Sequence, residues 1–288
     1  MSSTAHSSPG KSPASSIKRT FRCIICTDSR GRGLGDVLNE AEIVQKLPEE
    51  ARQRVGIELQ TIIRPGAGIE SLINYIAKHP EKNNFDLLIV SAGICNLTTK
   101  KTTDDGAAKI NYEITNGVDK IKSIVESTIA EYGKKIHYAT ITPASLVKFY
   151  LYKNRGKQIS QEEKNVLEEQ QTRLVDDCKE INNFIIKRNT ERECPTLRWA
   201  SQCMRSTKRR QKNSRKLRPT VYKFCDSKLH DGLHPDDTLK KVWFSLAVRF
   251  ISELIRREVS PTKSSQSSTT EDPESEQEQY NFKRQKRK

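Results

Sequence analysis

The sequence lacks the features that mark membrane and secreted proteins. No stretch approaches the roughly 18 consecutive apolar residues that a membrane-spanning helix needs. Residues 1–16 are rich in Ser, Pro and Gly and contain no apolar block, so they do not form a secretory signal. We therefore expect a chain that works inside the cell, in the cytoplasm or the nucleus, without a membrane partner.

The cysteines lack the pairing of a disulfide framework. There are seven, an odd number, and they are scattered along the chain. Cys23 and Cys26 form a C-x-x-C, but the letters around them, FRCIICT, are typical of a buried strand. Alternation along a strand puts these two thiols on opposite faces, and no second pair stands at zinc-ligand spacing. We expect structural thiols and no metal site.

Hydrophobic residues are scarce, at 34%, whereas charged residues reach 30% and the formal net charge is +15. This balance indicates one real core with polar segments attached. We predict disordered segments at 1–18 and 259–288. Between them we predict one folded domain at 19–258, which contains a basic insertion at about 201–219.

The positive charge is concentrated in two places. The segment from Arg205 to Arg218 contains eight Lys and Arg residues and no acid, and the last six residues, KRQKRK, contain five more. Such clusters attract phosphate backbones or nuclear import receptors, although solvated charge that only aids solubility is the alternative. The candidate nucleic-acid-binding residues are Lys208, Arg209, Arg210, Lys212, Arg215, Lys216 and Arg218. The aromatic content of 6% argues weakly against a surface that stacks single-stranded bases.

Short apolar runs alternate with helical patterns along the chain. Strands are predicted at 21–26, 57–63, 85–90 and 136–141, with a fifth at 197–200. Helices are predicted at 36–46, 69–77, 114–129, 161–185 and 239–254, the fourth with a capping box at Ser160 and Glu163. This order predicts an α/β three-layer sandwich, with a central, mostly parallel sheet of about five strands and helices on both faces.

Polar and glycine-rich residues follow the predicted strands. The first strand leads into TDSRGRG at 27–33, the second into RPGAG at 64–68 and the third into SAGICN at 91–96. Late in the chain, DGLHP at 231–235 precedes the last helix. Ligands of open parallel sheets bind beyond the carboxyl ends of the strands. We therefore expect the polar residues of these four blocks to converge on one rim of the sheet.

These four blocks, in this order, resemble the SGNH (GDSL-type) hydrolases, whose fold is flavodoxin-like. The resemblance implies that Ser29 is the nucleophile, that His234 is its general base and that Asp231 orients His234. It also implies an oxyanion hole made of the backbone N–H groups of Ser29 and Gly66 and the side-chain amide of Asn96. The implied substrate is an ester of unspecified identity, and the implied chemistry needs no metal or cofactor.

The resemblance covers residues 21–258 and departs from the family pattern at two positions. Thr27 stands where the family usually has glycine, and Leu97 follows Asn96 where it usually has aspartate. Neither change removes a proposed catalytic atom, but both alter the residues that aim those atoms. The chain also resembles esterase-like domains encoded by some animal retrotransposons, a likeness that rests on analogy alone.

Each of these residues also has an ordinary structural interpretation. Ser29 can be a helix N-cap, and Gly66, with Gly68 nearby, can permit a tight turn. Asn96 can be a turn residue. The Asp231 and His234 pair can cap the last helix, with Pro235 in its first turn. A second histidine, His230, lies close by, and only the family register selects His234.

Three arginines lie in the same blocks. Arg30, Arg32 and Arg64 favour an acidic or phosphate-bearing substrate if they face the pocket, and Arg30 and Arg64 are our candidate substrate-binding residues. If they face solvent, they are ordinary surface charge. Residues 99–106 can be either a lid or a disordered loop.

Two functions follow from these observations. The first is a serine hydrolase that cleaves a carboxyl ester or an acetyl group on a larger carrier. The second is a weakly active or inactive module of the same fold that binds RNA or DNA through its basic loop and tail. The complete set of Ser, Gly, Asn, Asp and His favours the enzyme.

Overall fold

A parallel sheet forms the centre of the molecule. In the computed structural model of the chain, residues 19–80, 84–112, 116–207 and 221–259 are described. The sheet has four strands in the order β2-β1-β3-β6. Their bounds are Arg19–Thr27 for β1, Val55–Ile63 for β2, Leu87–Ser91 for β3 and Ile136–Tyr138 for β6. All three neighbouring pairs are parallel, as the alternation of strands and helices predicts.

The strand register places the polar blocks level with one another. Thr27, the last residue of β1, pairs with Ile63 of β2 and with Ser91 of β3. Each of these three residues ends its strand, so the segments that begin at residues 28, 64 and 92 all start at the carboxyl edge of the sheet. This edge is where an open parallel sheet binds ligands.

Two hydrophobic cores lie on the two faces of the sheet. In β1, Ile24 and Cys26 belong to one core, whereas Phe21, Cys23 and Ile25 belong to the other. The alternation of side chains along a strand produces this division. It confirms the prediction that the two thiols of the C-x-x-C lie on opposite faces. Burial raises the pKa of both thiols, that of Cys26 to about 12, so both are neutral.

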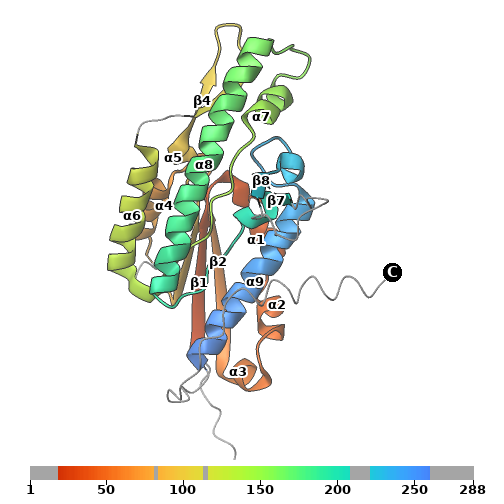
Figure 1. Ribbon diagram of the computed structural model, residues 1–288. Coiled ribbons are helices and arrows are strands. Elements are labelled where there is room, and N and C mark those ends of the chain that lie inside the picture. The colour runs from red at the N-terminus through yellow and green to blue at the C-terminus, as the bar shows by residue number, and fades with distance from the viewer. Residues whose placement is uncertain (1–18, 81–83, 113–115, 208–220, 260–288) are drawn as a thin grey trace, which may run out of the picture.

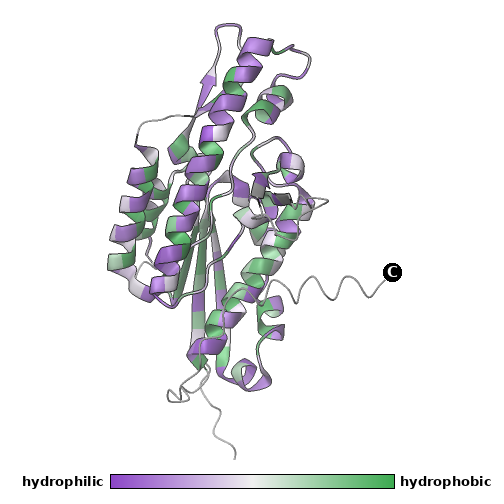
Figure 2. Cartoon of the chain, viewed as in Figure 1, coloured by the Kyte–Doolittle hydropathy of each residue, from purple (hydrophilic) through white to green (hydrophobic). Residues whose placement is uncertain are grey.

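Helices cover both faces and complete the three layers (Figure 1). The first core includes α4 (Ile69–Ala77), α5 (Ile94–Leu97), α6 (Gly117–Tyr132), α7 (Leu146–Lys153) and α8 (Gln161–Glu191). The second includes α1 (Leu34–Val37), α2 (Glu40–Gln45), α3 (Glu49–Arg54) and α9 (Asp237–Val259). Figure 2 shows the apolar residues of the long helices gathered in stripes, with hydrophilic residues between them.

Helix α8 follows the sequence prediction closely. The side chain of Ser160 accepts a hydrogen bond of 3.1 Å from the N–H of Glu163, so the predicted cap forms. The predicted apolar stripe is buried along its whole length; its members are Leu167, Leu174, Cys178, Ile181 and Ile185. The helix ends at Glu191, six residues beyond the prediction.

Two predicted elements are wrong. The helix predicted at 36–46 is interrupted, because the side chain of Asn39 accepts a hydrogen bond from Glu42 N–H and starts α2 anew. The strand predicted at 197–200 does not form. Thr140 N–H donates to the carbonyl of Leu197, but Thr140 Oγ1 accepts the next bond, from Ala200 N–H, and a 3-10 helix, η3 (Ala200–Cys203), follows. The hydroxyl of Thr140 thus accepts a hydrogen bond that a backbone carbonyl would accept if residues 197–200 formed a fifth strand.

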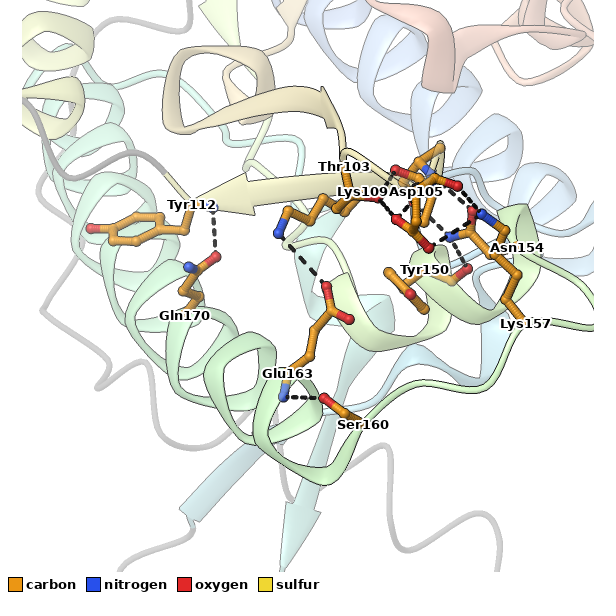
Figure 3. A network of polar contacts seen from close by, with 12 residues as sticks. Thr103, Asp105, Lys109, Tyr112, Tyr150, Asn154, Lys157, Ser160, Glu163 and Gln170 are labelled. Atoms are coloured by element: carbon orange, nitrogen blue, oxygen red, sulfur yellow. Dashed lines mark hydrogen bonds and ion pairs between the residues drawn. The ribbon is translucent and has the colours of Figure 1, made fainter.

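Residues 99–106 lie in an antiparallel hairpin of β4 (Thr98–Thr102) and β5 (Ala108–Tyr112), not in a disordered loop. The side chain of Asn154 both accepts from Ala108 N–H at 2.8 Å and donates to its carbonyl at 2.7 Å. Gln170 of α8 accepts from Tyr112 N–H at 3.1 Å. Figure 3 shows these contacts, together with the ion pair between Lys157 and Asp105. The hairpin is thus attached to the helical layer at both ends.

A second hairpin pairs β7 (Met204–Thr207) with β8 (Val221–Phe224), and the short 3-10 helix η4 (Asp226–Lys228) follows it. The residues between these strands and the predicted disordered segment at 1–18 lie outside the described residues. So does the segment predicted at 259–288, apart from Val259, which ends α9 (Asp237–Val259). The domain limits therefore stay predictions. Among the described helices, none is both long enough and apolar enough to cross a membrane.

Candidate active site

The loop after β1 holds Ser29 in a tight turn. Asp28 accepts a hydrogen bond of 2.9 Å from Arg30 N–H and starts the 3-10 helix η1 (Ser29–Gly31). A Cβ atom at Gly31 would lie 2.0 Å from Cγ2 of Thr27, so the turn can fold back on the strand only with glycine there. Ser29 is 9% exposed, at the carboxyl edge of the sheet.

The loop before α9 holds Asp231 and His234 together. Oδ1 of Asp231 accepts from the N–H groups of Leu233 at 3.0 Å and His234 at 2.8 Å. Oδ2 of the same carboxylate lies 2.8 Å from Nδ1 of His234. Gly232 has φ of +83°, and a Cβ atom there would lie 2.5 Å from the carbonyl oxygen of Ser145. The loop conformation therefore requires glycine at this position.

These two loops, far apart in the sequence, meet at one hydrogen bond. Nε2 of His234 lies 3.1 Å from Oγ of Ser29. An ionised Asp231 can only accept, so Nδ1 of His234 carries the proton and Nε2 presents its lone pair to the Ser29 hydroxyl. The structure therefore brings Ser29, His234 and Asp231 into one continuous hydrogen-bonded chain.

The surroundings keep Asp231 ionised. Burial acts to raise the pKa of Asp231, but the hydrogen bonds from the backbone and side chain of His234 and from the Leu233 N–H outweigh it. The pKa of Asp231 is consequently below its ordinary value. The carboxylate is charged at neutral pH and can stabilise a positive charge on His234.

The loops after β2 and β3 meet at the side chain of Asn96. Oδ1 of Asn96 accepts from Ile69 N–H at 2.8 Å, which fixes the amide orientation. Nδ2 has no hydrogen-bond partner among the described residues and can donate to a substrate. A Cβ atom at Gly68 would lie 2.7 Å from Oδ1 and 2.9 Å from Nδ2 of Asn96, whereas one at Gly66 would meet nothing within 4 Å. The structure thus places Gly68, and not the predicted Gly66, against Asn96.

The sequence contains a signal for this choice. Gly68 is the N-cap of α4, and backbone N–H groups at a helix start have no partner within the helix. Gly66 is exposed and has a left-handed backbone conformation, with φ of +76°. Gly66 therefore supplies the turn, and Gly68 supplies the close approach. A prediction that weighted the helix start over the turn would have named Gly68.

Arg30 lines the cavity beside Ser29 and is held there by an ion pair. Its guanidinium is 5% exposed, pairs with Asp28 at 3.0 Å and donates to the carbonyl of Thr142 at 2.6 Å. It touches the cavity beside Ser29, but its charge is already neutralised inside the protein. The solvent-facing alternative is therefore wrong, because the carboxylate of Asp28 holds the side chain in the protein. The role of Arg30 in substrate binding stays a prediction.

Arg64 lies elsewhere. It is exposed, stacks over the ring of Tyr75 at 4.4 Å and lines a separate cavity of about 390 Å³ against α4. It does not line the cavity of Ser29. Its role in substrate binding stays a prediction that the geometry of the Ser29 cavity does not favour.

A cavity of about 380 Å³ opens beside the serine. Its lining comes from the loop after β1 and from the residues that lead into α9. These are Ser29, Arg30, Arg32, His230, His234, Pro235, Asp236, Asp237 and Lys240. Neither His230 nor Lys240 belongs to a recognisable sequence pattern, so no local signal predicts that they line a pocket. Within the described residues, no group of three His, Cys, Asp or Glu side chains is arranged to hold a metal ion.

The seven candidate nucleic-acid-binding residues, from Lys208 to Arg218, all lie outside the described residues. The described part of their hairpin contains two exposed cations, Arg205 in β7 and Lys223 in β8. These two residues are paired directly opposite one another. Nucleic-acid contact through this segment stays a prediction.

Comparisons with known proteins give likenesses of fold only. No protein-family model and no curated protein matches the sequence. Among solved structures, a lipase/acylhydrolase from Enterococcus faecalis aligns with 16% identity and a TM-score of 0.49, over 81% of this chain and 96% of the other. A GDSL-like lipase from Bacteroides thetaiotaomicron aligns with 11% identity and a TM-score of 0.43, over 83% and 89%.

An acetyl xylan esterase aligns with 15% identity and a TM-score of 0.43, over 83% of this chain and 100% of the other. These identities and TM-scores are low, and we transfer neither an activity nor a residue role from them. The parallel sheet and the helices on both of its faces define the α/β architecture.

Proposed function

We propose that the chain is a serine hydrolase that cleaves a carboxyl ester or removes an acetyl group from a larger carrier. The observation that carries this proposal is the hydrogen-bonded chain from Ser29 through His234 to Asp231, with successive distances of 3.1 and 2.8 Å. A nucleophile, a base and an orienting carboxylate in this order are what acyl transfer requires. The resemblance of the four sequence blocks to SGNH hydrolases supports the same conclusion.

In the first half of the reaction, Nε2 of His234 takes the hydroxyl proton as Oγ of Ser29 attacks the carbonyl carbon of the ester. The electron pair of the C=O bond moves to the oxygen, which becomes an oxyanion. Asp231 stabilises the imidazolium that forms. His234 then gives the proton to the leaving alcohol as its C–O bond breaks, and an acyl group remains on Ser29.

In the second half, water takes the place of the alcohol. His234 removes a proton from the water, the hydroxide oxygen attacks the acyl carbon, and Ser29 leaves with that proton. Hydrogen-bond donors have to receive the oxyanion in both halves. We assign this task to the backbone N–H of Ser29, to Nδ2 of Asn96 and to the N–H of Gly68, in preference to Gly66.

Labelling with a fluorophosphonate probe tests the proposal. The wild-type chain should react covalently, and Ser29→Ala should not, because the probe captures only an activated serine. Ser201→Ala is the matched control, since Ser201 is an exposed serine on η3, and it should label like the wild type. A wild type that does not label, or a Ser29→Ala variant that labels equally, would refute the hydrolase.

A further inference from the structure

The cavity beside Ser29 carries charged groups that the hydrolytic mechanism does not use. Two acids line it; Asp237 is in an ion pair, and Asp236 keeps its negative charge while it accepts a backbone N–H. Oδ1 of Asp236 accepts from Leu239 N–H at 2.7 Å and caps α9, and Asp237 pairs with Lys240 at 3.0 Å. Arg32 lines the same cavity, is exposed and has no ion-pair partner among the described residues. The cavity therefore offers one uncommitted positive charge.

His230 supplies a second donor to this cavity. Its Nε2 lies 3.0 Å from the hydroxyl of Tyr152, and the two rings meet edge to face at 5.0 Å. When the hydroxyl of Tyr152 donates to Nε2, Nδ1 of His230 carries the ring proton and can donate in turn. The guanidinium carbon of Arg155 lies 4.6 Å from the centre of the Tyr152 ring and helps to hold that ring in place. The contact with Tyr152 thus fixes the ring of His230, which lines the cavity.

The chemistry of the reaction indicates which half of an ester would occupy this cavity. The leaving alcohol has to reach Nε2 of His234 to receive its proton. His234 and Pro235 line the cavity, whereas Asn96 and Gly68, which we assign to the carbonyl oxygen, do not. A bound ester would therefore place its alcohol half in the cavity.

We propose that this cavity recognises an anionic group, a carboxylate or a phosphate, on the alcohol half of the ester. Arg32 would pair with the anion, and Nδ1–H of His230 would donate to it. Lys240 is a weaker contributor because Asp237 already holds it. The proposal rests on the proposed hydrolase function and narrows its substrate class.

Two matched esters test it. The neutral probe is 4-nitrophenyl acetate, and the anionic probe is 3-carboxy-4-nitrophenyl acetate, which differs by one carboxylate on the alcohol half. Arg32→Ala should lower kcat/KM for the anionic ester about tenfold, mainly through KM, and change that for the neutral ester by less than about twofold. The quantity compared between variants is the ratio of kcat/KM for the anionic ester to kcat/KM for the neutral ester. This ratio cancels the difference in intrinsic reactivity between the two esters.

Two further variants locate the effect. Arg54→Ala removes an exposed arginine from α3, away from the cavity, and should leave the ratio unchanged. Tyr152→Phe removes the hydroxyl that orients His230 and should lower the ratio by about threefold, less than Arg32→Ala, because a neutral donor contributes less than a charge.

The outcomes separate this inference from the proposed function. If both esters are hydrolysed through Ser29 but the ratio is the same in wild type and Arg32→Ala, the anion site is refuted and the hydrolase stands. If neither ester is hydrolysed, the hydrolase itself fails. A third probe, 4-nitrophenyl hemisuccinate, carries its carboxylate on the acyl half. If Arg32→Ala lowered kcat/KM for this ester as much as for the anionic ester above, the assignment of the anion site to the alcohol half would be overturned.

Discussion

Two histidines, one beyond the carboxyl edge of the sheet and one within a strand, have very different surroundings. His234, at the carboxyl edge, is 26% exposed and lies between a carboxylate and a hydroxyl. His137, on β6, is 2% exposed and lies against a cavity at the amino ends of β1 and β3, with its ring edge to face on Phe250 at 5.3 Å. Its Nδ1 has no hydrogen-bond partner among the described residues.

The contrast shows why only one of them is suited to catalysis. Burial lowers the pKa of His137 to about 4, and the positive charge of Arg192 adds to the effect. His137 therefore stays neutral at pH 7 and cannot store a proton during a reaction. Asp231, in contrast, offers His234 a negative charge that stabilises its protonated form.

The largest expected effect separates the two histidines by activity. Asp231→Asn should lower kcat by about 10³ to 10⁴ fold, because an amide that donates to Nδ1 would force His234 into the wrong tautomer. His137→Phe should leave kcat at pH 7 within about twofold. Steady-state ester hydrolysis measures both, and a comparable loss in the two variants would break the contrast between the two histidines.

A pair of glycines sharpens the description of the carboxyl edge. Gly68→Ala should lower kcat by about 10² fold, because the new Cβ atom displaces the amide of Asn96 from the oxyanion. Gly66→Ala meets no neighbour, but its positive φ should lower the free energy of unfolding by about 1 kcal/mol with little change in kcat. Kinetics and denaturant unfolding of both variants test this assignment; the reverse pattern would restore Gly66 to the oxyanion hole.

The smallest expected effect concerns His137 and is visible only in stability. Because the pKa of His137 is lower in the folded chain than the ordinary value of 6.5, the unfolded chain binds the proton first as pH falls. The stability that depends on neutral His137 is complete above pH 6.5 and is lost progressively towards pH 4. The loss amounts to about 3 kcal/mol at most.

His137→Phe should remove this pH dependence, and urea unfolding at several pH values between 7 and 4 measures it. The lowered pKa of Asp231 contributes stability that is lost mainly as pH falls below its ordinary value of 3.8, so it adds little between pH 7 and 5. If the phenyl ring does not fit, His137→Gln serves the same purpose. An equally steep loss in the variant would assign the acid sensitivity to other groups.

Local sequence patterns correctly predicted the helices and strands in which buried and exposed residues alternate regularly. The alternation in β1 predicted the two faces of the sheet, and the cap at Ser160 predicted the start of α8. These patterns failed where a side chain competes with the backbone. Asn39 divides a helix, and Thr140 takes the hydrogen bond that a fifth strand would have made.

The α/β order and the four polar blocks can be read from the sequence alone, because burial periodicity and turn residues are local properties. What those blocks contact depends on how the chain packs in three dimensions. That packing brought His234 to Ser29 across 205 residues, placed Arg30 in the core beside Asp28, put Gly68 against Asn96 and oriented His230 through Tyr152. These contacts depend on the register of β1 with its neighbours and on the packing of α7 and α9, which no local pattern contains.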